Sequence, residues 1–168
     1  MFQTTHYSGD RDKDYPLLIK QLEALNEGET NRVAILANAS ALLDQYLSNV
    51  NWVGFYLWDS DELVLGPFQG LPACIRIPYG KGVCGTALSD KKTQLVKDVR
   101  AFPGHIACDS ASKSEIVIPL YMNDIIFGVL DIDSPTTNRF DSVDQHYLEK
   151  FAETLMDYIT NHTLEFVN

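Results

Sequence analysis

The spacing of apolar residues predicts helices toward both ends of the chain. In Asp14–Glu27 and in Thr30–Ser48, apolar residues recur every three or four positions, which is typical of a helix with one buried face. A final helix is expected to begin near Asp141, because a short acceptor side chain can cap the first free backbone amides. Its buried stripe is expected to comprise Leu148, Phe151, Ala152, Leu155 and Ile159.

Between these helices the apolar period changes to two, which is the spacing of β-strands. The first strand, Asn51–Trp58, carries three aromatic residues on the face opposite its aliphatic side: Trp52, Tyr56 and Trp58. Further elements are expected as strands at Leu63–Phe68, Cys74–Ile77, Thr93–Val99, Ser114–Tyr121 and Ile125–Asp133, a short helix at Val83–Lys91 and a polar loop at Arg100–Lys113. Because strands outnumber crossover helices, we expect an α+β fold with a mostly antiparallel sheet and helices on one face.

The composition narrows the class of protein. The 168 residues, 45% of them hydrophobic, suit one domain spanning 1–168, with no internal repeat or linker. No apolar run approaches the ~18 residues that span a bilayer, and the polar start lacks the apolar stretch of a signal peptide, so we expect a soluble cytoplasmic protein with no membrane partner. The net charge of −10 disfavours nucleic acid as a partner.

Three cysteines, Cys74, Cys84 and Cys108, are too few and odd in number for a secreted disulfide framework. They form no close pair of the kind that zinc sites use, and a metal site would have to be assembled across the fold, so we expect none. Cys84 lies near the start of a predicted helix, where the helix dipole favours a thiolate. Cys108 lies in the polar loop near His105 and Lys113, whose charge would lower its pKa, although the adjacent Asp109 opposes this effect.

The segment Gly80–Gly85 matches the glycine pattern of dinucleotide-binding loops. A dinucleotide-binding fold needs repeated strand–helix–strand crossovers, whereas this chain offers hairpins. We therefore interpret the segment as a tight turn that allows close backbone packing.

Acidic residues gather on the clearest hairpin. If a three-residue turn, 122–124, joins its strands, Glu115 lies opposite Asp131, and Asp133 lies two residues further on the same face; a two-residue turn would separate Glu115 from Asp131. Paired carboxylates repel each other unless a positive charge compensates them. They form either a solvated strand end or a pocket for a cation. The following sequence lacks the glycine and glutamate of a calcium loop, which favours an organic cation, and Trp52 and Tyr56 could wall such a pocket.

Several stretches resemble one enzyme family. NWVGFYL, LGPFQG, GKGVCGTA, DVRAFPGHIACD, SEIVIPL and VLDIDSPTTNRFD occur in an order that is similar to the free methionine-(R)-sulfoxide reductases, which have the GAF fold. The resemblance implies a six-stranded antiparallel sheet, with the first two helices and the last helix on one face and the pocket on the other. It places the core at about 30–160, with 1–28 as an N-terminal extension that includes the first helix.

The resemblance also implies a reaction. The substrate would be free methionine (R)-sulfoxide, attacked by Cys108; the sulfenic acid formed would condense with Cys74, and Cys84 would be a second resolving or relay thiol. Three carboxyl groups would hold the amino group and the sulfoxide, those of Glu115, Asp131 and Asp133. Trp52 and Tyr56 would pack against the methyl end. No bound cofactor would be needed, because thioredoxin or another dithiol would reduce the disulfide, and the helices would form a homodimer.

Two other functions remain open. A non-catalytic GAF sensor would bind a small molecule in the same pocket, and Asn138–Asp144 resembles a cyclic-nucleotide motif, although Gln145 replaces its glutamate. A thiol-based peroxide sensor or peroxidase would use the cysteines without the acids. Substitution of the acids distinguishes these functions.

Overall fold

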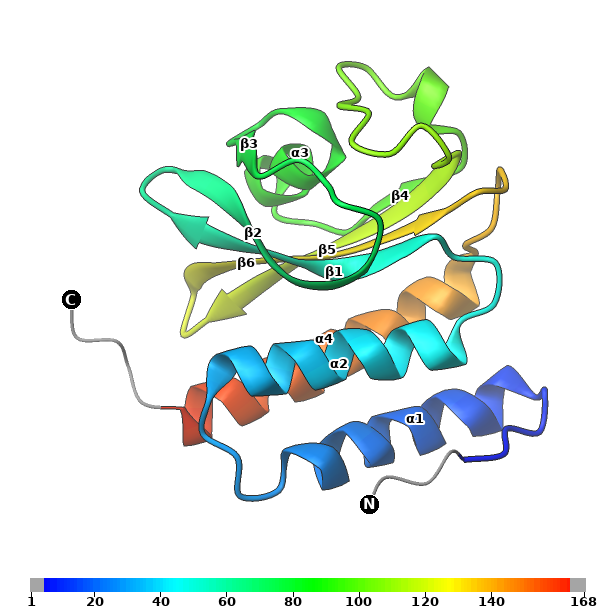
Figure 1. Cartoon of the computed structure of the whole chain (residues 1–168), viewed down its shortest axis with the longest axis vertical. Coiled ribbons are helices and arrows are strands. Elements are labelled where there is room, and N and C mark those ends of the chain that lie inside the picture. Colours follow the sequence, from blue (N-terminus) through cyan, green and yellow to red (C-terminus); the bar gives the residue numbers. More distant parts are fainter. Residues whose placement is uncertain (1–4, 164–168) are drawn as a thin grey trace.

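Six antiparallel strands form one sheet in the order β3-β2-β1-β6-β5-β4 (Figure 1). The computed structural model describes residues 5–163 of the chain. The strands are β1 (Trp52–Asp59), β2 (Glu62–Gly70), β3 (Arg76–Pro78), β4 (Gln94–Val96), β5 (Ser114–Met122) and β6 (Ile125–Ser134). The helices are α1 (Arg11–Asn26), α2 (Arg32–Tyr46), α3 (Gly82–Asp90), the 3-10 turn η1 (Val99–Ala101) and α4 (Ser142–His162). The α+β class is confirmed.

Helices α2 and α4 pack against one face of the sheet, and α1 packs outside them in a third layer (Figure 1). Helix α3 lies on the opposite face, against β5 and β6. The strands therefore separate two hydrophobic clusters: a large one under the long helices and a smaller one under α3. The predicted stripe of α4 is confirmed, because all five of its residues are buried in the large cluster: Leu148, Phe151, Ala152, Leu155 and Ile159.

Helix starts follow the caps that the sequence supplies. Helix α1 begins at Arg11, one turn before the expected Asp14, because the side chain of Asp10 accepts a hydrogen bond from the amide of Asp12. Helix α4 begins after Asp141, as predicted. There Asp141 and Asp144 form a capping box, in which each side chain accepts a hydrogen bond from the other's backbone amide.

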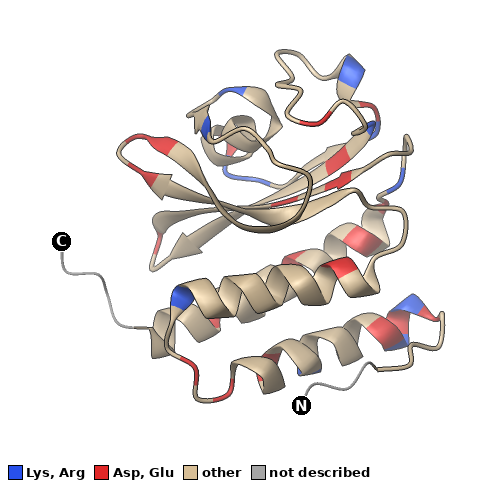
Figure 2. Ribbon diagram, in the orientation of Figure 1, with Lys and Arg blue, Asp and Glu red and all other residues tan. Residues whose placement is uncertain are grey.

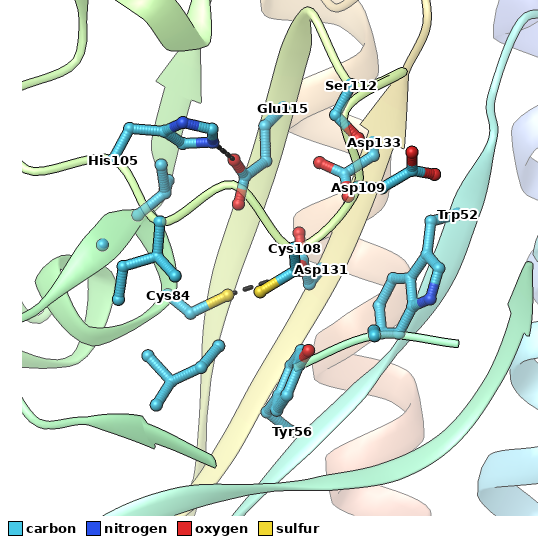
Figure 3. A pocket seen from close by; sticks show the side chains of 15 residues that line it. Trp52, Tyr56, Cys84, His105, Cys108, Asp109, Ser112, Glu115, Asp131 and Asp133 are labelled. Atoms are coloured by element: carbon cyan, nitrogen blue, oxygen red, sulfur yellow. Dashed lines mark hydrogen bonds and ion pairs between the residues drawn. The ribbon is translucent and has the colours of Figure 1, made fainter. Parts of the chain in front are cut away.

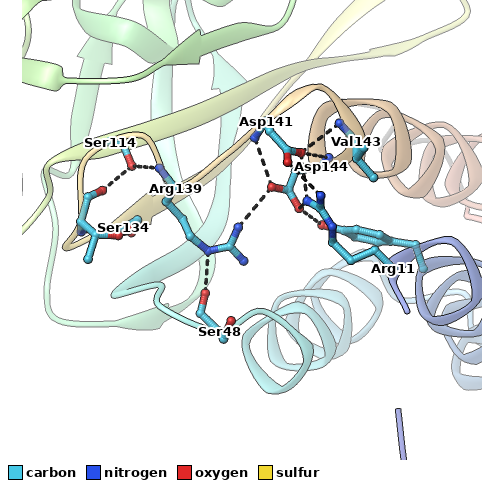
Figure 4. A network of polar contacts seen from close by, with 10 residues as sticks. Arg11, Ser48, Ser114, Ser134, Arg139, Asp141, Val143 and Asp144 are labelled. Atoms are coloured by element: carbon cyan, nitrogen blue, oxygen red, sulfur yellow. Dashed lines mark hydrogen bonds and ion pairs between the residues drawn. The ribbon is translucent and has the colours of Figure 1, made fainter. Parts of the chain in front are cut away.

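Asp144 is also the centre of a buried polar network that joins α4 to the rest of the fold (Figure 4). Its carboxylate accepts a hydrogen bond from the hydroxyl of Tyr15 at 2.6 Å and forms ion pairs with Arg139 at 3.1 Å and Arg11 at 3.3 Å. Arg139 also donates to the carbonyl oxygen of Ser48, in the segment before β1. A buried carboxylate needs such partners, and here they fix the end of α4 against α1 and the β1 segment.

Two short strands differ from the prediction. The third strand, expected at Cys74–Ile77, is β3 at Arg76–Pro78, because the carbonyl of Cys74 bonds to a side chain instead of a ladder partner. The fourth, expected at Thr93–Val99, ends at Val96, because Asp98 caps η1 by accepting a hydrogen bond from the amide of Arg100.

The pairing of β5 with β6 corrects the predicted register. The turn has two residues, Asn123 and Asp124, both with positive φ, and it joins Met122 to Ile125. A bulge then adds a second shift in the register, between Leu120 and Tyr121. As a result Glu115 lies opposite Asp133, whereas Asp131 lies opposite Val117, so the prediction that Glu115 faces Asp131 directly was wrong.

The bulge preserves the faces of the hairpin, because two shifts of one residue restore the alternation. Glu115, Asp131 and Asp133 still share one face. On the turn side of the bulge the alternation is reversed, so Ile126 packs against the cluster under α3. Gly128 follows the bulge with φ of +153°, and a Cβ there would lie 2.1 Å from the carbonyl oxygen of Tyr56. Only glycine fits this close approach of two strands.

The glycine-rich segment is the tight turn that was expected. The amide of Gly80 donates a hydrogen bond to the carbonyl of Gly85, and a Cβ on Gly85 would lie 2.5 Å from the carbonyl oxygen of Pro78. Helix α3 therefore packs directly against the end of β3, which brings Cys84 onto the sheet. Within residues 5–163, no helix combines the length and apolar character needed to cross a bilayer.

Candidate active site

A pocket lies between the sheet, the first turn of α3 and the loop that precedes β5 (Figure 3). Sulfur, carboxylate and aromatic side chains line it together. The predicted site residues that line it are Trp52, Tyr56, Cys84, Cys108, Glu115, Asp131 and Asp133. Cys74 is bonded to a lining residue, so the structure brings together all eight residues that the sequence singled out.

Three carboxyl groups occupy the sheet side of the pocket, where Figure 2 shows acidic positions on the neighbouring strands β5 and β6. Glu115 and Asp131 are each only 6% exposed, so the alternative of a solvated strand end was wrong. Burial, then the charges of Asp131 and Asp133, raise the pKa of Glu115 well above its usual range. Burial raises the pKa of Asp131 to about 6, and burial together with Asp131 raises the pKa of Asp133. Protonated carboxyl groups are therefore available in the pocket near neutral pH.

The carboxyl groups bond to one another and to neighbouring side chains: Glu115 and Asp131 share a side-chain hydrogen bond, and Ser112 bonds Asp133. The thiol of Cys84 donates a hydrogen bond to Oδ2 of Asp131 across 3.4 Å, while Oδ1 of Asp131 is buried without a partner in residues 5–163. Nε2 of His105 lies 3.9 Å from Oε2 of Glu115 (Figure 3). Burial lowers the pKa of His105, which favours the neutral imidazole. His105 therefore faces an acid and does not supply the positive charge beside Cys108 that the sequence suggested.

Cys84 differs from the expectation of a helix-start thiolate. It is the third residue of α3, but it is buried, and burial followed by the charges of Asp131 and Glu115 raises the pKa of its thiol well above the usual value. Burial and like charge outweigh the helix dipole. The thiol is thus a hydrogen-bond donor in the pocket. Among residues 5–163, Cys84, Glu115 and Asp131 are the only set of three potential ligands whose atoms lie close enough together to hold a metal ion.

Cys74 and Cys108 form a disulfide, and Cys84 remains free. The bond joins the segment before β3 to the long loop before β5, and 34 positions separate the two cysteines in the sequence. The spacing of the cysteines alone did not decide between the three pairings. The pair that forms is the one that the family resemblance implied.

Aromatic rings form the opposite wall. The ring of Trp52 stacks between Tyr56, at 5.7 Å between centroids, and Phe68 of β2, at 5.2 Å. Gly54 allows this arrangement, because a Cβ there would lie 2.3 Å from the Cβ of Phe68. The third aromatic residue on this face, Trp58, makes an edge contact with Tyr79 and does not line the pocket.

Sequence reasoning missed a clamp on the loop that carries Cys108. Nδ2 of Asn51 donates to Oδ2 of Asp109 at 2.9 Å and to Oγ of Ser112 at 3.1 Å, while its backbone amide donates to the carbonyl of Asp133 at 2.9 Å. Asp109 and Ser112 both line the pocket. Asn51 and Asp109 are 58 positions apart in the sequence, so local patterns do not indicate their contact. The sequence shows only that Asn51 is a polar residue directly before an apolar strand.

Comparison with known proteins gives concordant matches. Residues 31–159 match the model of the GAF domain. Protein YtsP of Bacillus subtilis (strain 168) is 60% identical over 157 residues, which cover 92% of this chain and 96% of the relative. The free methionine-R-sulfoxide reductase of Escherichia coli (strain K12) is 52% identical over 141 residues, covering 84% and 86% of the two chains.

A solved structure, the free methionine-R-sulfoxide reductase from Neisseria meningitidis in complex with its substrate, is also similar. It superimposes with a TM-score of 0.89 and 45% identity, over 95% of this chain and 96% of that chain. The similarity to these proteins therefore extends over most of each chain, and the residues matched by the GAF model, 31–159, include every residue that lines the pocket.

Proposed function

This chain belongs to the GAF-domain family and, within it, to the free methionine-R-sulfoxide reductases, and from that premise we propose how its pocket works. The protein reduces free methionine (R)-sulfoxide to methionine. One observation carries the proposal for the site: a disulfide between two cysteines lies beside three carboxyl groups with raised pKa values, in a single pocket.

The pocket suits a small amino acid that carries a positive charge. Glu115, Asp131 and Asp133 hold its ammonium group and its sulfoxide, and none of the described residues that line the pocket is a lysine or an arginine. Trp52 and Tyr56 pack against the methyl end. A methionine sulfoxide residue inside a peptide lacks the ammonium group and would leave buried carboxylates without a partner, so the free amino acid is preferred.

The oxygen of the sulfoxide passes to the enzyme in the first step. The thiolate of Cys108 attacks the sulfoxide sulfur and forms a sulfur–sulfur bond while a protonated carboxyl group donates its proton to the oxygen. The hydroxyl group then passes to the sulfur of Cys108 as the sulfur–sulfur bond breaks, which releases methionine and leaves Cys108 as a sulfenic acid. The thiol of Cys74 then displaces water from the sulfenic acid and forms the disulfide. Cys108 is thus oxidised, the substrate sulfur is reduced, and the oxygen departs as water.

Cys84 is the second thiol of the same pocket, and we assign it the role of a relay or second resolving thiol. Its raised pKa keeps it protonated, so it follows the attack by Cys108 and does not begin it.

The disulfide must be reduced to complete the cycle. A dithiol reductant such as thioredoxin would do so by exchange, which requires no bound cofactor or metal. A compartment that maintains reduced dithiols suits this chemistry, so we infer a cytoplasmic location. We also infer that residues 1–168 form one domain, with 1–28 as an N-terminal extension, and that the helices form a homodimer.

Incubation with separated diastereomers tests the function. With dithiothreitol as reductant, chromatography should show loss of free methionine (R)-sulfoxide and formation of methionine, whereas the (S) diastereomer and an N-acetylated (R) substrate should persist. Consumption of the (S) form at an equal rate would contradict the proposed pocket.

A Cys108→Ser variant tests the nucleophile. It should form no methionine in a single turnover, because the attacking sulfur is gone. Methionine formation in one turnover by this variant would transfer the attack to Cys84 or Cys74.

A further inference from the structure

A thiol and two carboxyl groups from three separate elements converge in the pocket (Figure 3). Cys84 belongs to α3, Glu115 to β5 and Asp131 to β6, and their sulfur and carboxylate oxygen atoms all lie within 4.8 Å of one another. All three side chains are buried. We propose that this cluster binds a zinc ion and that zinc thereby blocks the pocket.

The donor set matches the preferences of Zn²⁺, which binds cysteine sulfur and carboxylate oxygen. With Zn–S near ~2.3 Å and Zn–O near ~2.1 Å, a tetrahedral ion separates sulfur from oxygen by about 3.6 Å. Sγ of Cys84 and Oδ2 of Asp131 already lie 3.4 Å apart. Small rotations of Glu115 and Asp131 would complete three protein ligands.

A second observation points to a ligand at the same place. Oδ1 of Asp131 is buried without a hydrogen-bond partner in the described part of the chain, and the residue is 6% exposed. Buried polar atoms are normally satisfied, so this oxygen is available to a positive ligand, which would replace the proton that Asp131 shares with Glu115. Among residues 5–163, neither lysine nor arginine lines the pocket, so the wall presents no permanent positive charge to a cation.

Three protein ligands leave one position of a tetrahedral ion open, as in zinc sites that keep a bound water. This position faces the pocket, because all three ligands line it. The ion displaces the proton of the Cys84 thiol when it binds. It would occupy the carboxylates that hold the substrate, so zinc and methionine sulfoxide exclude each other. The exclusion rests on the proposed function, whereas the binding of zinc does not.

Binding is tested on the disulfide-bonded protein, in which Cys84 is the only free thiol. Titration with Co²⁺ should produce the charge-transfer absorption of a cobalt–thiolate bond, and added Zn²⁺ should remove it. Cys84→Ser should abolish the absorption. Glu115→Gln and Asp131→Asn should each weaken Co²⁺ binding by at least ~10-fold, the typical cost of losing even an outer-shell partner of a metal. Asp44→Asn, which removes an exposed carboxylate on α2, should leave it unchanged.

Lack of the absorption in the parent protein, or its persistence in Cys84→Ser, would overturn the site. The site would also be overturned if both carboxyl variants bound Co²⁺ with the same affinity as the parent protein. Circular dichroism verifies that the variants are folded. If Asp131→Asn does not fold, Glu115→Gln alone suffices for the test. In steady-state assays in which thioredoxin regenerates the reduced enzyme and dithiothreitol is omitted, Zn²⁺ should raise the apparent KM for the sulfoxide. If cobalt binds as expected and no sulfoxide is ever turned over, the proposed function fails and the metal site stands.

Discussion

The hydroxyl of Tyr56 donates a hydrogen bond to the carbonyl oxygen of Cys74 at 2.9 Å, and so ties the aromatic wall to one half of the disulfide. Burial, then the charge of Asp131, raises the pKa of Tyr56, so the hydroxyl stays protonated and remains a donor. The same residue stacks on Trp52. One side chain therefore both shapes the pocket and positions the segment that carries Cys74.

Tyr56→Phe keeps the ring and removes this anchor. We expect methionine formation in a single turnover to persist, while the disulfide forms about 2- to 10-fold more slowly, the kinetic equivalent of one net hydrogen bond. Rapid-quench sampling that follows methionine and free thiols separately measures both steps. Tyr121→Phe is the matched control, because the Tyr121 hydroxyl is buried without a partner in residues 5–163. If the anchor is irrelevant, both variants will form the disulfide at the parental rate.

The carboxyl groups distinguish a reductase from a peroxide-reactive thiol protein. Glu115→Gln and Asp131→Asn should each lower turnover of methionine sulfoxide by ~10²-fold or more, the usual contribution of a positioned proton donor. Oxidation of the thiols by hydrogen peroxide should persist, because that reaction does not need the substrate's ammonium site. Parallel assays with the two oxidants measure the difference.

Asp98→Asn is the control for these variants, since Asp98 pairs with Arg100 outside the pocket. It should retain parental turnover of the sulfoxide. Equal loss of both reactions in the Glu115 and Asp131 variants would instead indicate a general defect of the thiols, and unchanged turnover of the sulfoxide would show that the acids do not form the substrate pocket.

The faces of the strands could be predicted from the sequence, but the register could not. Alternation placed Trp52 and Tyr56 on one side of β1 and the acids on one side of the β5–β6 hairpin. The two-residue turn and the bulge near Gly128 each move the register by one, and their effects on the faces cancel. A pattern of period two cannot detect two compensating shifts, because it records only which face a residue occupies.

Contacts between distant loops were also beyond the sequence pattern. Neither the Asn51–Asp109 pair nor the position of His105 beside Glu115 follows from local periodicity. The thiolate predicted for Cys84 failed for a related reason. The helix start was foreseen, whereas burial among carboxyl groups on two other strands, which raises the thiol pKa, depends on the tertiary fold.

The buried acids should make stability depend on pH in a particular direction. The pKa of Asp131 is raised from 3.8 to about 6 by burial, so between about pH 4 and pH 6 the folded protein holds a proton that the unfolded chain has lost. Stability from this group is therefore present at low pH and is lost as the pH rises through 6. Asp131→Asn removes this loss. We expect the variant to gain up to ~3 kcal/mol in unfolding free energy, relative to the parent, on going from pH 4 to pH 7.

Urea denaturation at the two pH values measures this difference. Asp98→Asn provides a control of opposite sign, because hydrogen bonds from Arg100 lower the pKa of Asp98 to about 2. Asp98 stabilises the folded protein above its unfolded pKa, and this stabilisation is lost as the pH falls. The effect is small because the Asp98–Arg100 pair is solvent-accessible. The unfolding free energy of Asp131→Asn, relative to that of the parent, could instead be higher at pH 4 than at pH 7. That result would mean that the buried carboxyl group is ionised in the folded protein at low pH.

Asn51 should act on catalysis through the loop that it holds. Its amide nitrogen bonds both Asp109 and Ser112, so the segment next to Cys108 is fixed to the start of β1 at two points. Asn51→Ala removes both bonds, while Oδ1 of Asp109 keeps the hydrogen bond that it accepts from the amide of Ala111. The thiol of Cys108 should then sample more positions, which lowers kcat for the sulfoxide by about 10-fold through loss of orientation, while the pH profile of its alkylation keeps the parental form.

Steady-state kinetics and the pH dependence of iodoacetamide alkylation of the reduced protein separate these causes. Asn161→Ala is a suitable control, since the Asn161 side chain bonds the exposed carbonyl of Asp157 within α4, away from the pocket. Asn51→Ser, whose hydroxyl can still donate a single hydrogen bond, should recover part of the lost kcat. If Asn51→Ala shifts the alkylation profile and Asn51→Ser restores nothing, the residue acts on the ionisation of Cys108 and the loop clamp is not its means of action.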